Sequence, residues 1–116
     1  MTALEAEVIQ RMLTDPQLSP RRRVLDPSNP LVVEERSVNE VGFITSIARN
    51  DAAKLFADDT SMRWGKVVGR LNSEVDVDFV VYVDDGFVNA VEGVTFGGES
   101  WPSSIEEFEL TEISRS

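Results

Sequence analysis

Glu92 is the side chain in this sequence best placed to do chemistry. It stands in the stretch VEGVTFGGESWP at residues 91–102, where a glycine pair and Trp101 follow it. A carboxylate that is withdrawn from water has a raised pKa and can act as a general acid or base. Aromatic side chains beside such a group are typical of ligand-pocket walls. Glu92 and Trp101 are therefore the first candidates for a functional site.

The burial of Glu92 depends on the register of a hairpin around Asp85-Gly86, a pair that is favoured in two-residue type I′ turns. A two-residue turn places Glu92 opposite Phe79, on the apolar face of the sheet. A three-residue turn shifts the returning strand by one residue and places Glu92 beside Tyr82, as a solvated acid. We expect the first register, because it points four apolar side chains of the returning strand inward together. These are Val88, Ala90, Val94 and Phe96.

A buried Glu92 has two interpretations. Its carboxylate can accept hydrogen bonds from the Gly97-Gly98 turn or from the Trp101 indole. We favour this structural role, because buried polar groups are normally satisfied by neighbouring protein groups. The alternative is a small-molecule-binding or weakly catalytic pocket between helix and sheet. The expected lining of that pocket is Phe43, Thr45, Glu92, Phe96 and Trp101.

The composition argues against most catalytic chemistry. The chain has no histidine and no cysteine, which excludes Ser-His and Cys-His nucleophiles and the usual zinc sites. The glycine pair is not followed by the Lys-Ser or Lys-Thr of a phosphate loop. The acids Asp76, Asp78, Asp84 and Asp85 lack the spacing of a calcium loop. We therefore expect no catalytic residue, no metal site and no cofactor, and favour a protein that is not an enzyme.

Charge restricts the partners. Lys and Arg number 11 against 21 Asp and Glu, and the formal net charge of −10 repels the phosphates of nucleic acids. We interpret the exception, Arg21-Arg22-Arg23, as a solvated turn that offsets nearby acids; the alternative is a grip on an anion or an acidic partner. No apolar run is long enough to cross a membrane, and residues 1–10 lack a secretory pattern. We therefore expect a soluble cytoplasmic protein that binds neither nucleic acid nor membrane.

The elements that position these side chains predict a single α+β domain over residues 1–116. Thr2 and Glu5 fit a capping box, and an apolar face at helical spacing follows them. This pattern predicts an N-terminal helix that ends before Pro16, since proline disfavours helical geometry in the residue that precedes it. Residues 19–26 predict a second, short helix, with proline near its first turn.

From residue 31 onward, β-branched and aromatic residues recur with a period of two, which is typical of strands. No helical stretches intervene to make parallel crossovers, so we expect an antiparallel sheet of about five to six strands. The N-terminal helix, or both helices, would pack on this sheet. The expected strands cover residues 31–38, 41–48, 65–74, 75–84 and 87–96 and a short segment from 108.

Two segments, VGFITSIA at residues 41–48 and VYVDDGFVNAVEGVTFGGESWP at residues 81–102, resemble a group of small, uncharacterised bacterial proteins. Members of the group pair a Val-Gly-Phe-hydrophobic-Thr segment with a hairpin that ends in a Glu-Gly, Gly-rich, Trp-Pro corner. Val94 departs from the pattern, which has an aromatic residue there. The resemblance implies a compact α+β fold and no particular activity. The landmarks in this chain are Glu92-Gly93 and Trp101-Pro102.

Without recognisable catalytic chemistry, the expected function is protein binding. One form is an immunity-like or antitoxin-like inhibitor of a basic protein, and another is self-association as a dimer. One face of the sheet keeps a half-apolar patch that needs a second cover or a partner. In a third alternative, residues 50–64 cover this face and leave no large patch. The expected members of the patch are Val80, Tyr82, Phe87 and Val91.

Overall fold

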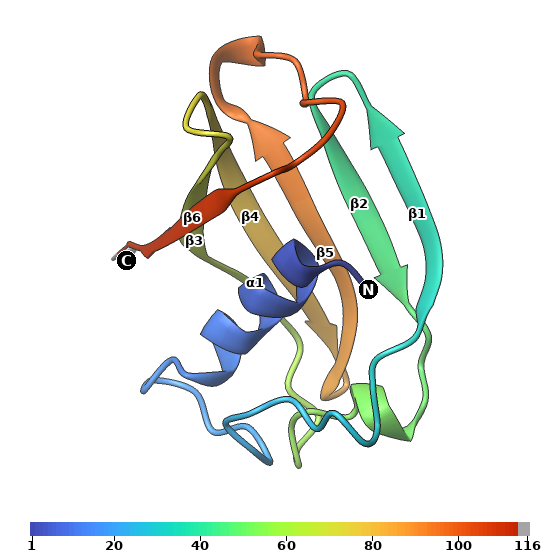
Figure 1. The fold of residues 1–116 in the computed structure, drawn as a ribbon. Coiled ribbons are helices and arrows are strands. Elements are labelled where there is room, and N and C mark those ends of the chain that lie inside the picture. The colour runs from blue at the N-terminus through green and yellow to red at the C-terminus, as the bar shows by residue number, and fades with distance from the viewer. Residues whose placement is uncertain (114–116) are drawn as a thin grey trace.

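The computed structural model describes residues 1–113 and places one helix against one face of a six-stranded antiparallel sheet (Figure 1). The strands lie in the order β1-β2-β5-β4-β3-β6. This arrangement confirms the predicted α+β class. The elements are α1 Ala3–Leu13, β1 Val33–Asn39, β2 Gly42–Ile47, η1 Asp51–Ala53, β3 Met62–Leu71, β4 Val75–Asp84, β5 Phe87–Thr95, η2 Phe96–Gly98 and β6 Phe108–Glu112.

Helix α1 begins with the predicted capping box. The backbone amide of Glu5 donates a hydrogen bond to Thr2 Oγ1 (3.2 Å), and the amide of Thr2 donates one to Glu5 Oε1 (2.8 Å). These bonds satisfy two amides that the first turn of a helix leaves without a partner. Within residues 1–113, no helix is long and apolar enough to cross a membrane.

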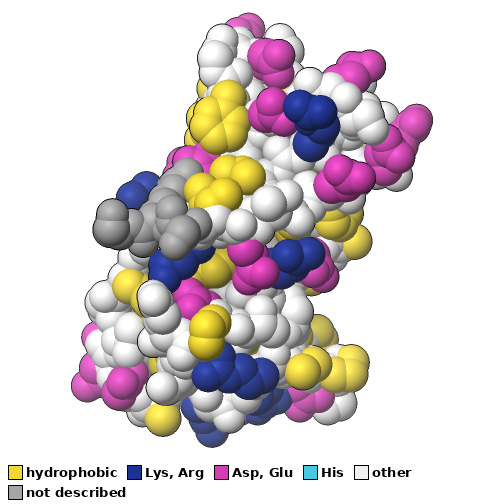
Figure 2. All heavy atoms as spheres, turned by 90° about the vertical axis from the view of Figure 1, so that its left-hand side faces the viewer, with side chains coloured by type: hydrophobic (Ala, Val, Ile, Leu, Met, Phe, Trp, Pro, Cys, Tyr) yellow, Lys and Arg dark blue, Asp and Glu magenta, His cyan; other side chains and the backbone are white. Residues whose placement is uncertain are grey.

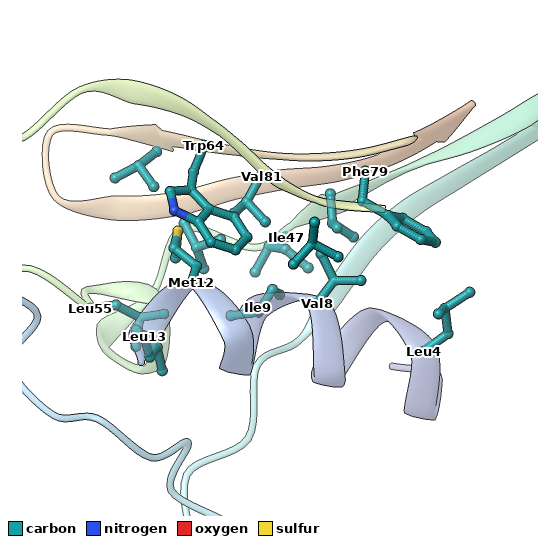
Figure 3. Packing of buried hydrophobic residues seen from close by; sticks show 14 of the residues in the cluster. Leu4, Val8, Ile9, Met12, Leu13, Ile47, Leu55, Trp64, Phe79 and Val81 are labelled. Carbon is teal, nitrogen blue, oxygen red and sulfur yellow. The ribbon is translucent and has the colours of Figure 1, made fainter. Parts of the chain in front are cut away.

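The core lies between α1 and one face of the sheet, which we call the covered face (Figure 3). Five apolar side chains of α1 point towards this face, as the spacing predicts. Full burial of a Val, Leu, Ile or Phe side chain stabilises a fold by about 1.5–3 kcal/mol, so this layer holds the helix in place. The α1 side chains are Leu4, Val8, Ile9, Met12 and Leu13, and those of the covered face include Phe43, Ile47, Trp64, Phe79, Val81 and Val91.

The β4–β5 hairpin has the predicted two-residue turn. Asp85 and Gly86 both have positive φ, at 52° and 83°, as a type I′ turn requires. The turn is enclosed by the segment that contains η1, because the amides of Leu55 and Phe56 both donate to the Gly86 carbonyl. Leu55, Phe56 and Ala53 are buried in the core. The third alternative, in which residues 50–64 cover the other face of the sheet, is therefore wrong.

The register of this hairpin differs from the prediction further along the strands. A β-bulge at Asn89 adds one residue to β5, so Phe79 pairs with Gly93 and not with Glu92. Every later side chain of β5 thereby changes face. The prediction of an inward Glu92 is wrong, because the two-residue turn by itself implies no shift and the bulge within the strand introduces one.

Gly93 takes the inward position that Glu92 was expected to occupy. A Cβ atom at Gly93 would lie 2.6 Å from Phe43 Cε1 and 3.0 Å from Phe79 Cε1, both closer than van der Waals contact. Only glycine leaves room for the two rings at this point of the sheet. The Glu-Gly pair is thus explained by packing on the covered face.

Residues 14–32 form a long loop and not the predicted second helix. The side chain of Gln10 binds this loop at two points: Nε2 donates to the Arg23 carbonyl (2.5 Å), and Oε1 accepts from the Leu25 amide (2.9 Å). Pro20 forms an isolated β-bridge with Phe56. These contacts engage backbone groups that a helix would use internally, so tertiary contacts override the local helix signal.

The corner after β5 turns through Gly97 and Gly98, whose φ values are 65° and 74°. The Trp101 amide then donates to the Glu40 carbonyl (2.6 Å), and the Trp101 ring packs on Phe43 with centroids 5.1 Å apart. From this corner the chain passes across the covered face to β6 (Figure 1). The corner is therefore a packed element of the fold.

Candidate functional site

The face of the sheet opposite α1 carries a continuous array of side chains from its central strands, which we call the open face. Register pairs place these side chains together, because directly opposed residues on neighbouring strands share a face. One row runs Ile44, Glu92, Val80, and a second runs Ser46, Ala90, Tyr82, Arg63. A third row runs Val94, Asp78, Val68, Thr111.

Tyr82 and Glu92 form the polar centre of the open face. Tyr82 Oη donates a hydrogen bond to Glu92 Oε1 (2.7 Å) from the neighbouring strand. The guanidinium of Arg63 lies over the Tyr82 ring, 5.5 Å from its centroid. The two contacts hold a carboxylate, an aromatic ring and a cation next to one another on the open face.

Apolar side chains flank this centre. Ile44 is 39% exposed and lies directly opposite Glu92 in the same row, and Val94 is 42% exposed in the neighbouring row. Val80 is half-buried beside them. The face therefore combines exposed aliphatic surface with ordered polar groups.

The bulge at Asn89 divides the residues that were predicted to bind a partner. Val80 and Tyr82 lie on the open face as expected. Val91 is fully buried on the covered face, so the prediction that it is displayed for a partner is wrong. Phe87 lies at the hairpin tip, where the guanidinium of Arg49 is 4.4 Å from its ring centroid.

The residues predicted to line a ligand pocket are not brought together. Phe43 and Trp101 are in contact, and Thr45 is buried next to them on the covered face. Glu92 lies on the other side of the sheet, and Phe96 is exposed at the corner. The space beside Phe43 and Trp101 is about 80 Å³. That volume is well below the ~300 Å³ at which ligand pockets begin.

Glu5, and not Glu92, is a buried glutamate. Its side chain is almost fully enclosed and accepts hydrogen bonds from Arg36 Nη2 (2.6 Å) and Nε (2.9 Å), and from the hydroxyl of Thr45. Burial by itself raises the pKa of the Glu5 carboxyl, but the bonds from Arg36, Thr45 and the Thr2 amide outweigh it and hold that pKa below its usual value. The sequence signal was present, because Glu5 falls between Leu4 and Val8 on the apolar stripe of α1.

Asp15 is a second buried acid, just beyond the other end of α1. Its Oδ2 accepts from the Trp64 indole (2.8 Å) and lies 3.4 Å from Lys66 Nζ, while Oδ1 accepts from the Gln17 amide (2.9 Å). Burial raises the pKa of the Asp15 carboxyl, but these donors leave it below its usual value. Both oxygens of each buried acid are bound by protein groups, so these two acids fix the helix on the sheet.

The arginine cluster has three separate roles. Arg23 donates to the carbonyls of Leu13, Asp15 and Leu18 (3.0, 2.7 and 2.7 Å). These bonds satisfy backbone carbonyls at and just beyond the C-terminal end of α1. Arg21 donates to a backbone carbonyl of the segment that contains η1. Arg22 pairs with an acid, as a charge-offsetting turn predicts.

Three aspartates of β4 and its turn bind arginines. Asp84 and Asp85 accept from Arg49 (2.9 and 3.1 Å), and Asp76 accepts from Arg70 (3.0 Å). Among residues 1–113, no group of three acidic side chains converges where it could hold a metal ion.

Neither a protein-family model, nor a curated protein, nor a solved structure matches this chain. The resemblance to small bacterial proteins therefore stays a prediction. The candidate site is defined by the geometry of the open face alone.

Proposed function

We propose that this protein is a non-enzymatic binding module and that its ligand is a basic protein docked on the open face. The observation that carries the proposal is the contrast between the two sides of the sheet. Helix α1 packs on the covered face, whereas Ile44 and Val94 remain exposed beside Glu92 on the open face. Apolar side chains gathered at such a position are typical of interaction sites.

Charge favours a basic partner over a second copy of this chain. The molecule carries a formal charge of −10, and the open face contributes Glu35, Asp78 and Glu92 to it. Two copies joined through this face would bring like charges together, which costs free energy. A basic surface would meet complementary charge and would be steered towards the face during encounter.

The centre of the face has the residue types that dominate binding energy in protein interfaces. Tyr and Arg are enriched among residues whose truncation weakens binding strongly, and Tyr82 lies in contact with Arg63 here. A basic enzyme whose active-site groove is covered by this face would be inhibited. The immunity-like or antitoxin-like role is therefore the concrete form of the proposal.

The test begins with the tagged full chain in its native cell. A protein that co-purifies in stoichiometric amount is identified by mass spectrometry, purified, and titrated against wild type and Ile44→Lys. We expect a basic partner whose affinity for Ile44→Lys is at least about tenfold weaker. Its affinity for wild type should fall as salt is raised, because salt screens exposed charges over about 10 Å at 0.1 M.

Val24→Lys is the matched control, because Val24 is 67% exposed on the 14–32 loop and receives the same added charge. It should bind the partner within about twofold of wild type. The proposal is overturned if Ile44→Lys binds as tightly as Val24→Lys, or if no stoichiometric basic protein is retained. A wild-type dimer in sedimentation that Ile44→Lys converts to a monomer would also overturn it, in favour of a second copy.

A further inference from the structure

A pocket of about 300 Å³ lies between α1, residues 22–31 and the segment that contains η1. Its size is at the lower end of the ~300–1,000 Å³ range of small-molecule sites. Two alanines, Ala6 from α1 and Ala52 from η1, leave the space that larger side chains would fill. The remaining apolar wall includes Leu25, Leu31 and Leu55.

The wall formed by the loop is fixed before any ligand arrives. The two hydrogen bonds of Gln10 attach the loop to α1 on either side of Val24. Further along, Asp26 Oδ1 accepts from the Ser28 amide (2.9 Å) and holds a tight turn. A pocket whose walls are already ordered binds its ligand at a smaller entropic cost.

Arg22 is the cation at the edge of this pocket. Its neighbours Arg21 and Arg23 are bound to backbone carbonyls, whereas Arg22 lines the pocket and pairs with Asp26 through Nη1 (3.1 Å). A guanidinium has five N–H donors, so this pair leaves the donors of Nε and Nη2 for a ligand. Such donors match a carboxylate in two parallel hydrogen bonds.

The charge around the pocket differs from that of the molecule as a whole. Arg22 and Asp26 both line the pocket, and Arg21 and Arg23 are the neighbours of Arg22 in the chain. Figure 2 shows dark blue Lys and Arg side chains gathered at the lower end of the molecule, where Figure 1 places these loops, and mostly magenta acids at the upper end. The three arginines of this loop outnumber the one acid that lines the pocket, Asp26, so an anion that the net charge of −10 repels elsewhere is favoured here.

We propose that this pocket binds a small amphipathic carboxylate. The apolar body lies against Ala6, Leu25 and Ala52, and the carboxylate is held by Arg22. A grip on an anion is one of the two roles expected for the arginine cluster, and Arg22 is the one arginine of the three that would perform it. It is independent of the open face, because no residue is shared between the two sites.

Octanoate, and its uncharged amide octanamide, test the proposal on the full chain. We expect octanoate to bind saturably at one site in calorimetry and to shift the backbone NMR signals of Ala6, Leu25 and Ala52. Arg22→Gln should weaken octanoate binding at least about tenfold, the factor that corresponds to about 1.4 kcal/mol, and leave octanamide binding within about twofold. Arg21→Gln is the matched control, because it removes the same charge from the adjacent residue, outside the pocket.

Filling the pocket gives a second, independent measurement. Ala52→Leu should abolish the binding of both compounds. If Ala52→Leu loses thermal stability, Ala6→Leu fills the pocket from the helix side and should have the same effect. Absence of saturable octanoate binding to wild type would overturn the proposal. So would equal weakening by Arg21→Gln and Arg22→Gln, or wild-type affinity in a folded Ala52→Leu variant.

Discussion

Glu5 and Glu92 are on opposite sides of the same sheet, and each carboxylate accepts a hydrogen bond from a hydroxyl group of that sheet. Thr45 binds Glu5 on the covered face, and Tyr82 binds Glu92 on the open face. The surroundings differ. Glu5 is 1% exposed and bound by Arg36, whereas Glu92 is half-buried among side chains that remain in contact with water.

The difference shows how position on the sheet sets the role of an acid. An acid on the covered face cannot be hydrated, so each of its oxygens needs a protein donor, and the donors tie α1 to β1 and β2. An acid on the open face keeps part of its hydration. Glu5 and Asp15 are therefore structural, whereas Glu92 remains in contact with water.

Removal of Arg36 should have the largest effect on stability. Arg36→Met leaves the Glu5 carboxylate enclosed without its cation, and breaking a fully buried pair costs ~3–5 kcal/mol. Because the Arg36 side chain is 36% exposed, we expect a smaller loss of about 2–3 kcal/mol in the free energy of unfolding, measured by urea denaturation. The double variant with Glu5→Gln should recover part of this loss; a double variant less stable than Arg36→Met would contradict the pairing.

Trp64→Phe should have the next largest effect. It removes the indole donor to Asp15 and keeps an aromatic ring in the core. A hydrogen bond to a charged group contributes about 1.5–3 kcal/mol, and we expect a loss near the lower end because Gln17 and Lys66 still bind the carboxylate. Urea denaturation measures it, and a loss below about 0.5 kcal/mol would show that the indole contact carries little energy.

Acid should weaken the covered face. The folded-state pKa values of Glu5 and Asp15 lie below the ordinary values of 4.5 and 3.8. Their contribution to stability is therefore complete above those values and is lost as pH falls below them towards the folded-state pKa values. Urea midpoints should be level from neutral pH to about pH 5 and fall below about pH 4.5. The combined Glu5→Gln, Asp15→Asn variant should have a shallower fall; an equal slope would contradict the assignment.

Tyr82→Phe should have the smallest effect. It removes the hydroxyl that binds Glu92, but water can replace that donor on the open face. We expect a loss of about 0.5 kcal/mol in the free energy of unfolding, at the lower limit for a hydrogen bond. If the loss equals that of Trp64→Phe, the two faces do not differ in the way proposed.

Local patterns in the sequence determined the elements and their order. The capping box of Thr2 and Glu5 sets the start of α1, and Asp85-Gly86 sets the type I′ turn. These features depend on residues close together in the chain, whose backbone preferences and hydrogen bonds act at short range. The alternation of β2, with Phe43 inward and Ile44 outward, follows from the same local periodicity.

Tertiary structure alone decided on which face of the sheet Glu92 lies and where the candidate sites are. The bulge at Asn89 moves Glu92 to the open face and Gly93 to the covered face. Gly93 lies there against Phe43 and Phe79, which belong to two other strands. The loop of residues 14–32 was given a helical signal by its own sequence, yet its hydrogen bonds to Gln10 override that preference. Local preferences amount to tenths of a kcal/mol per residue, whereas buried contacts contribute about 1–3 kcal/mol each, so long-range packing prevails where the two conflict.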